Sequence, residues 1–373
     1  MIKLGGQQSF QPTWTGQLSD YVTVITYAPD GKSFAASSAA GEVIWWQQNS
    51  NLEPLTLLPA NNSCSVDCLA FSQDGQFLAA GGQSGQVHIW RLDSPDPELL
   101  LTLGNSTDWI DRLAWSPTQN LLAFSLGKYV QVWEATSGEI ATTLNFHDSS
   151  ALDITWHPDG NRLTVGGYQG VKIWTANDWD DDPYLLTIPS ASMAVAWSPD
   201  GKYIASGNLD RTITVLEWNE SYTSSDAAAI ASDTPLAPWV MRGFPSKIRQ
   251  LVWSTVFTAI GAPLLAAASA EGLVVWEKQE DEAQGWEGRV LPGHEEPIQA
   301  IQFQPNSLLL ASAASDSRLC FWQKAKRLSQ SINGAPDGFS CLAWQPQGHQ
   351  LAVGSQNGDL LVLAKTTRGQ GFG

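Results

Sequence analysis

Short runs of alternating apolar and polar residues recur along the chain in a fixed order, bounded by glycine, proline or aspartate. Alternation at a period of two residues is typical of β-strands with one buried face. In the best-defined unit, the pattern predicts four strands over residues 66–71, 77–81, 86–90 and 98–103. Tight turns such as Asp74-Gly75 separate them, because glycine adopts the positive φ that hairpin turns require. We name the four strands of a unit a, b, c and d in chain order.

This unit is repeated eight times. The aromatic residue that ends strand a marks each copy, at Tyr27, Phe71, Trp115, Trp156, Trp197, Trp253, Phe303 and Trp344. Four short strands at a spacing of about 40 to 56 residues are typical of the blade of a β-propeller. The sequence therefore predicts an all-β fold, a single domain over residues 1–373 formed by an eight-bladed β-propeller with four antiparallel strands per blade. Seven blades plus an irregular unit is the alternative.

The ends of the chain predict how the ring closes. Eight sets of strands a, b and c are present, but the chain ends shortly after the last strand c, at Asp359 to Leu363. The segment Phe10–Leu18 precedes the first strand a, as the d strands precede the others. We expect residues 1–19 to close the last blade, which removes free sheet edges. Residues 366–373 are predicted to be a flexible tail.

Several motifs resemble those of the WD40-repeat family over nearly the whole chain. Strand c carries a tryptophan at Trp46, Trp90, Trp133, Trp174, Trp276 and Trp322, and Pro-Asp-Gly turns join strands a and b in three units. The resemblance implies a propeller that binds protein partners. Gly293-His294 is the one Gly-His pair of this kind. For that unit the resemblance implies a structural hydrogen-bonded tetrad of His294, Ser312, Asp316 and Trp322.

The amino-acid composition and the net charge disfavour several classes of function. The chain has 373 residues with 20 Lys+Arg against 37 Asp+Glu, a formal net charge of −17. A field of this sign disfavours nucleic acid and anionic membranes as partners. The N-terminus lacks the basic and apolar regions of a secretory signal, and no apolar run is long enough to span a membrane. We expect a cytoplasmic protein, monomeric on its own, with reduced thiols at Cys64, Cys68, Cys320 and Cys341.

Departures from the repeat point to binding surfaces. In a propeller the a–b and c–d connections share one face, where this chain has its long insertions. They predict an acidic loop rim formed by Asp178, Trp179, Asp180, Asp181, Asp182, Tyr222, Glu280, Asp281, Glu282 and Trp286. Carboxylates mixed with exposed aromatic residues favour a basic, partly apolar protein partner. The alternatives are tolerated surface loops, or a calcium site at Asp178 and Asp180–Asp182, which lacks the glycine of a calcium loop.

The opposite face offers a second candidate surface, at the mouth of the central channel. The residues around the start of each strand a lie there, and the candidates for partner binding are Tyr21, Trp109, Asp111, Arg112, Lys247 and Arg249. Trp109 and Tyr21 are the expected apolar anchors. The alternative for Trp109 is a role in capping the interface between two blades.

Motifs of catalysis are missing from the sequence. The five histidines are scattered, and the chain contains no Gly-x-Ser-x-Gly, phosphate-binding glycine loop or His-Glu-x-x-His motif. We therefore expect no enzymatic activity, no cofactor and no metal. The predicted function is a scaffold for protein–protein interactions, as an assembly or regulatory subunit of a complex. The alternatives are a propeller that binds a small ligand or metal, and a hydrolase or lyase that uses the central channel.

Overall fold

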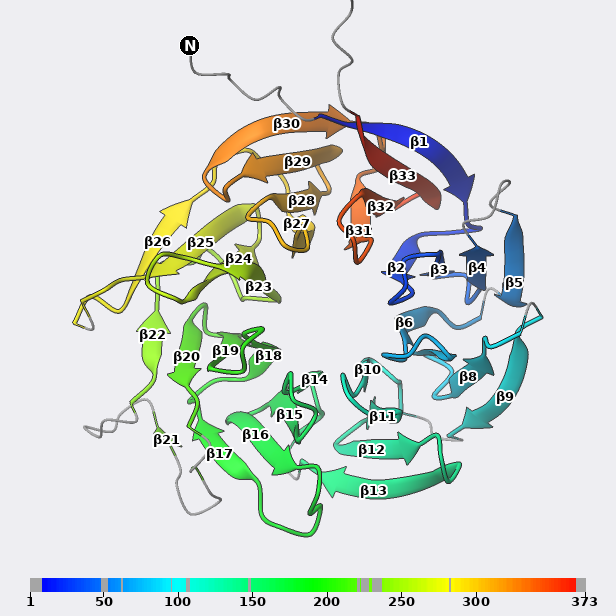
Figure 1. Ribbon diagram of the computed structural model, residues 1–373, viewed down its shortest axis with the longest axis horizontal. Coiled ribbons are helices and arrows are strands. Elements are labelled where there is room, and N and C mark those ends of the chain that lie inside the picture. The colour runs from blue at the N-terminus through cyan, green and yellow to red at the C-terminus, as the bar shows by residue number, and fades with distance from the viewer. Residues whose placement is uncertain are drawn as a thin grey trace, which may run out of the picture.

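The computed structural model is a closed ring of eight β-sheets around a central channel (Figure 1). It describes residues 9–47, 53–61, 63–94, 96–104, 108–146, 149–219, 222, 228–229, 237–281 and 283–366. Each sheet is one blade, with strand a beside the channel and strand d at the circumference. The predicted eight-bladed propeller is confirmed, and the alternative of seven blades is wrong.

The first four blades follow the chain without interruption. Blade 1 contains β2 (Val22–Tyr27), β3 (Ser33–Ser38), β4 (Val43–Gln47) and β5 (Pro54–Leu58). Blade 2 contains β6 (Val66–Phe71), β7 (Phe77–Gly82), β8 (Val87–Arg91) and β9 (Glu98–Leu103). Blade 3 contains β10 (Leu113–Trp115), β11 (Leu121–Leu126), β12 (Tyr129–Glu134) and β13 (Glu139–Asn145). Blade 4 contains β14 (Asp153–Trp156), β15 (Arg162–Gly167), β16 (Gly170–Thr175) and β17 (Tyr184–Thr187).

The remaining blades complete the ring. Blade 5 contains β18 (Ser192–Trp197), β19 (Tyr203–Asn208), β20 (Ile213–Glu217) and β22 (Trp239–Met241). Blade 6 contains β23 (Gln250–Phe257), β24 (Pro263–Ser269), β25 (Gly272–Lys278) and β26 (Trp286–Val290). Blade 7 contains β27 (Ile298–Phe303), β28 (Leu310–Ala314), β29 (Arg318–Gln323) and β30 (Arg327–Asn333). Blade 8 contains β31 (Phe339–Trp344), β32 (Gln350–Ser355), β33 (Asp359–Thr366) and β1 (Ser9–Gln17).

The hydrophobic core lies between adjacent blades. Strand b is buried along its whole length in blade 2, because sheets pack against both of its faces, whereas strand d is largely exposed. Small residues let the blades approach closely. A Cβ at Gly81 would lie 2.6 Å from the side chain of Ile110 in the neighbouring blade. The tryptophan that ends strand a also bridges the seam, since the Trp115 indole donates to the Ala70 carbonyl at 3.0 Å.

The N-terminal strand closes the ring. β1 pairs antiparallel with β33 at the outer edge of blade 8, as the position of Phe10–Leu18 predicts. Phe10 anchors it, with its ring stacked 4.8 Å from that of Phe321 in blade 7. Gln330 of blade 7 also exchanges two hydrogen bonds with the Phe10 backbone. Thr366 still pairs with Ser9, so this residue belongs to β33 and not to the predicted tail. Residues 367–373 of that tail lie outside the described part of the chain.

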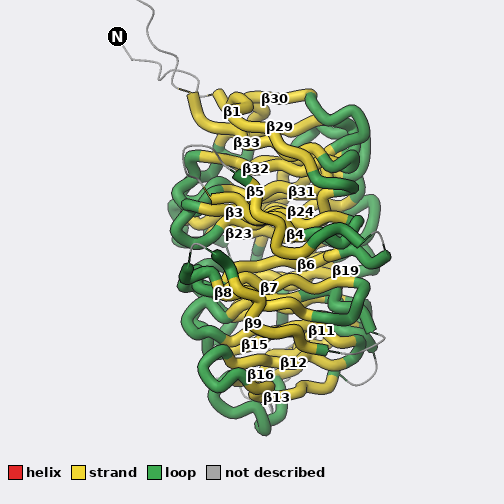
Figure 2. The backbone as a smooth tube through the Cα atoms, turned by 90° about the vertical axis from the view of Figure 1, so that its right-hand side faces the viewer, coloured by secondary structure: helices red, strands yellow, loops and turns green. Residues whose placement is uncertain are grey.

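Connections between strands gather on the two faces of the disc (Figure 2). We call the face with the b–c and d–a connections the upper face, and the face with the a–b and c–d connections the lower face. One element was not expected from the sequence. β21 (Ala228–Ala229), in the c–d connection of blade 5, pairs in parallel with β17 and adds a fifth strand to blade 4. The described residues contain no helix that could cross a membrane.

Candidate functional site

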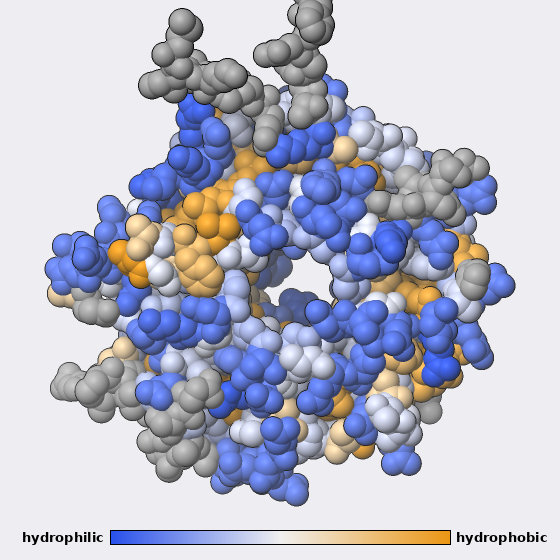
Figure 3. Space-filling model, in the orientation of Figure 1, coloured by the Kyte–Doolittle hydropathy of each residue, from blue (hydrophilic) through white to orange (hydrophobic). Residues whose placement is uncertain are grey.

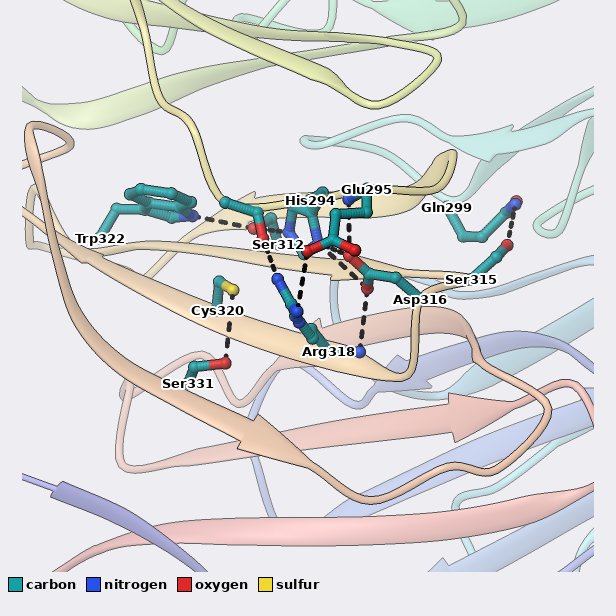
Figure 4. Close-up of polar contacts among 11 residues, drawn as sticks. His294, Glu295, Gln299, Ser312, Ser315, Asp316, Arg318, Cys320, Trp322 and Ser331 are labelled. Atoms are coloured by element: carbon teal, nitrogen blue, oxygen red, sulfur yellow. Dashed lines mark hydrogen bonds and ion pairs between the residues drawn. The ribbon is translucent and has the colours of Figure 1, made fainter.

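The predicted tetrad forms a continuous hydrogen-bonded chain in blade 7 (Figure 4). The Trp322 indole N–H donates to the Ser312 hydroxyl at 2.9 Å, and that hydroxyl lies 2.7 Å from His294 Nε2. His294 Nδ1 lies 3.1 Å from an Asp316 carboxylate oxygen. The His294 side chain is fully buried. One direction satisfies all three bonds: a neutral imidazole accepts from Ser312 and donates to Asp316.

Electrostatics agree with a structural role for this tetrad. Burial lowers the pKa of His294, although the Asp316 carboxylate opposes this shift. Asp316 also accepts backbone N–H bonds from Glu295 and Arg318, each at 3.0 Å. Arg318 in turn donates to the Gly293 carbonyl and the Glu295 carboxylate. The tetrad thus ties the d–a connection that enters blade 7 to strands b and c of that blade.

A second buried polar network, which the sequence analysis missed, lies in blade 5. The fully buried Asn208 donates from Nδ2 to the hydroxyls of Thr212 and Thr214, at 2.9 and 3.1 Å. Its Oδ1 accepts from Ser206 at 2.8 Å, and Ser206 also contacts Ser192. A buried network of polar side chains is therefore not confined to the tetrad of blade 7. The clustering of Ser, Asn and Thr around one b–c turn was the available signal.

The acidic loop rim keeps its charges exposed but not its aromatic residues. Asp178, Asp180, Asp181 and Asp182 are exposed in blade 4, as are Glu280 and Asp281 in blade 6. Trp286, by contrast, is buried and packs edge-on against Tyr203 and Trp253, with ring centroids 5.5 and 5.7 Å apart.

The other two aromatic residues of this rim are half-buried. Tyr222 stacks on Tyr184 at 5.5 Å, and Trp179 lies edge-on to Trp156 at 6.2 Å. The prediction of an acidic rim with exposed aromatic residues is wrong on this point. The long loops fold back and insert their rings between blades, where apolar surface is removed from water.

The carboxylates of the rim do not converge. No group of three or more His, Cys, Asp and Glu side chains within the described residues is placed to hold a metal ion. Asp178 and Asp181 instead accept backbone N–H bonds from their own loop, from Asp180 at 3.3 Å and Asp182 at 3.0 Å. Glu282 lies outside the described residues.

On the upper face the predicted channel-mouth residues are distributed around the ring. Tyr21 enters blade 1 and is half-buried, and burial raises the pKa of its hydroxyl. Lys247 is half-buried and Arg249 is exposed where the chain enters blade 6. Trp109, at the entry to blade 3, is 55% exposed. This exposure favours partner binding over the alternative for this residue, a cap on a blade interface.

Arg112, beside the exposed Asp111, makes the main polar link at this mouth. Its Nε lies 3.1 Å from Asp153 of blade 4, a residue that the sequence analysis did not single out. Burial raises the pKa of Asp153, which the Arg112 charge opposes. Asp153 also accepts the Val195 N–H at 2.8 Å, so blades 3, 4 and 5 are linked in series.

Two further exposed apolar side chains accompany Trp109 on the upper face. Tyr168 and Leu209, 55% and 50% exposed, occupy the b–c turns of blades 4 and 5. We name Trp109, Tyr168 and Leu209 the upper-face crescent, because they project from three consecutive blades. The sequence analysis missed the last two. The signal was a large apolar residue in a turn where blades 2 and 8 have Gln83-Ser84-Gly85 and Gln356-Asn357-Gly358.

Comparison with known protein families supports assignment of the fold to the β-propellers. The family model for the WD domain, G-beta repeat, matches residues 52–91, 138–175, 185–216 and 285–323. Each match spans the d strand of one blade and strands a to c of the next, the register in which the N-terminal strand closes the ring. No match was found among curated proteins. The chain therefore contains four WD40 repeats within an eight-bladed β-propeller, and propellers of this kind typically act as scaffolds for protein interactions.

Proposed function

We propose that this protein is a non-catalytic scaffold that binds a protein partner through its upper-face crescent, as an assembly or regulatory subunit of a complex. The exposure of Trp109, Tyr168 and Leu209 on consecutive blades carries this proposal. Large aromatic residues dominate the energetics of protein interfaces, and apolar side chains gathered on one face favour a partner over solvent.

The charged residues around the upper-face crescent also support it as the binding surface. The exposed Asp111 and Arg112 flank the channel beside Trp109, and the exposed Asp210 and Arg211 follow Leu209. An apolar centre with charged residues of both signs at its margin is typical of non-obligate protein interfaces. The strained φ of Arg211, +68°, is held by backbone bonds of its turn, which keep the turn that carries Leu209 in one shape before binding.

Affinity purification of the tagged protein at native expression, with mass spectrometry of bound proteins, tests this function. The test variant is Trp109→Ala/Tyr168→Ala, and the matched control is Asp180→Asn/Asp181→Asn/Asp182→Asn on the lower face. We expect a stoichiometric partner with the wild type and the control variant, and at least about a tenfold loss with the test variant. Loss of the partner only in the control variant would move the binding surface to the acidic loop rim. Absence of any stoichiometric partner would contradict the scaffold function.

A further inference from the structure

One a–b connection departs from the repeat in length and polarity. Seven of the eight a–b connections, all within the described residues, are short polar turns such as Pro199-Asp200-Gly201. In blade 6 the end of β23, the turn and the start of β24 form a long hairpin, residues 254–263, which we name the lower-face hairpin. It exposes Phe257 by 40% and Ile260 by 43%. The same region forms an apolar patch over blade 6 on a largely hydrophilic face (Figure 3).

The lower-face hairpin is an ordered structure. At its base the Ser254 hydroxyl accepts the Leu264 N–H at 2.9 Å and donates to the Val256 carbonyl at 2.7 Å. At its tip Thr258 pairs with Ala262, and Gly261, with a φ of +77°, closes the turn. These bonds hold the apolar side chains in water, although removal of apolar surface from water is energetically favourable. A partner surface that covers them would gain this favourable energy.

The hairpin is also fixed to the neighbouring blade. Thr255 Oγ1 accepts the Asn306 N–H of the blade 7 a–b turn at 2.8 Å. The two turns therefore form one surface across the seam between blades 6 and 7. This connection limits motion of the hairpin, which lowers the entropic cost of binding.

Exposed acidic groups lie on the same face and the same blade as this apolar surface. Glu280 and Asp281 are exposed in the c–d connection of the same blade, on the same face. Leu264, directly after the hairpin, lines a groove of about 290 Å³ between the outer strands of blade 6 and the c–d turn of blade 7. Its charged lining is Glu277, Glu287, Arg289 and Lys326. Lys326 is already engaged by Glu277, with Nζ 3.4 Å from the carboxylate.

We propose that the lower-face hairpin docks a basic amphipathic segment of a partner protein. Its apolar side contacts Phe257 and Ile260, and its Lys and Arg residues pair with Glu280 and Asp281. Charge complementarity with these carboxylates favours a basic segment as the occupant of this surface. A second copy of this chain, with a net charge of −17, would bring acidic loops against acidic loops. The lower-face hairpin would give the scaffold a second binding surface. Its binding does not depend on whether the upper-face crescent binds a partner.

The probe for this proposal is a fluorescent helical peptide of leucine and lysine with one apolar face, titrated into the purified protein. Its matched controls are a peptide of the same composition in an order without an apolar face, and a leucine–glutamate helix. The protein variants are Phe257→Ser/Ile260→Ser, Ile260→Ser alone, Glu280→Gln/Asp281→Asn, and Leu209→Ser on the upper face. Thermal unfolding verifies that each variant is folded, and the single variant keeps the test informative if the double variant is not.

We expect the basic amphipathic peptide to bind the wild type more tightly than either control peptide. The double hairpin variant should raise Kd at least about tenfold, and Ile260→Ser should raise it by a smaller factor. Glu280→Gln/Asp281→Asn should raise Kd and weaken its dependence on salt. Leu209→Ser should leave Kd unchanged, which separates this surface from the upper-face crescent.

Three results would overturn the proposal. The wild type and the folded hairpin variants could bind equally, which would mean non-specific attraction to an acidic protein. The wild type could fail to bind the amphipathic peptide. Sedimentation could also detect a dimer that the hairpin variants abolish, which would identify a second copy as the occupant.

Discussion

At the scale of single residues, the hydrogen bonds of the tetrad define the protonation state of the His294 imidazole. His294 Nε2 faces the Ser312 hydroxyl, which already accepts the indole N–H of Trp322. A neutral imidazole satisfies every polar atom of this chain. A second proton on Nε2 would make the Ser312 oxygen accept from both His294 and Trp322 and would deprive the Ser312 O–H of its acceptor. Protonation of His294 and folding of blade 7 are therefore coupled.

This coupling predicts a pH-dependent contribution to stability. Burial lowers the pKa of His294 in the folded state, whereas the unfolded chain has the ordinary value of about 6.5. The unfolded state therefore binds a proton more readily, and the contribution is lost as the pH falls below about 6.5. In urea unfolding, the free-energy difference between the wild type and His294→Gln should shrink between neutral and mildly acidic pH.

Ser331→Ala in the same blade is the control for this experiment, because Ser331 makes only a long 3.8 Å contact with Cys320. Its difference from the wild type should stay constant over the same pH range. A constant difference for His294→Gln as well would mean that the imidazole has the same affinity for protons in both states.

At the scale of the elements, the local pattern of apolar and polar residues specifies each strand. Closure of the ring depends instead on pairing between strands that are distant in sequence. β1 and β33 are at opposite ends of the chain and share one antiparallel ladder, from Ser9↔Thr366 to Gln17↔Asp359. Phe10 joins this ladder to blade 7 through its stack on Phe321 and its edge contact with Trp344. The last blade is therefore complete only when the first strand is in place.

Phe10→Ala tests this closure. Loss of a buried phenylalanine typically lowers the free energy of unfolding by about 3–5 kcal/mol, and here the same change loosens the closing strand. Gln11→Ala, at an exposed neighbouring position, should change stability by less than about 0.5 kcal/mol. Denaturant unfolding measures both variants. Equal stability of the two would mean that β1 is dispensable for the ring.

Sequence pattern located the strands well and the long connections poorly. Strand a of blade 2 was predicted over 66–71, and β6 spans Val66–Phe71, because its alternation matches a buried face and tight turns bound it. β21 escaped prediction, because a two-residue strand in a loop has no periodicity and exists only through its pairing with β17. Trp286 was misplaced for a related reason, since burial depends on the neighbouring blade and not on local sequence.

At the scale of the whole molecule, the ring shields its thiols at the seams between blades. Cys68 donates to the Ile110 carbonyl at 3.2 Å and Cys341 to the Val22 carbonyl at 3.7 Å, each across such a seam. Burial raises the pKa of both thiols, to about 12 for Cys341. The described structure contains no disulfide; Cys68 and Cys320 are buried, and Cys64 and Cys341 are half-buried.

Thiol labelling therefore reports on ring opening. In the native protein a soluble disulfide reagent should modify Cys64 first, with Cys68 and Cys341 at least about a hundredfold slower, since the thiolate is the reactive form. Both should become reactive at the same denaturant concentration, because opening one seam frees the ring. Earlier labelling of Cys341 would contradict this cooperativity and would mean that blades 8 and 1 separate locally.

The sequence by itself determined the repeat, the number of blades, the closing strand and the members of the tetrad. The first three follow from periodicity repeated in phase, and the members of the tetrad follow from the resemblance to WD40 repeats. Tertiary structure alone decided which aromatic residues are exposed. Trp286 is buried at a seam, whereas Trp109, Tyr168 and Phe257 remain in solvent. The physical reason is that exposure depends on the packing of adjacent blades, and contacts between residues distant in sequence leave no local pattern.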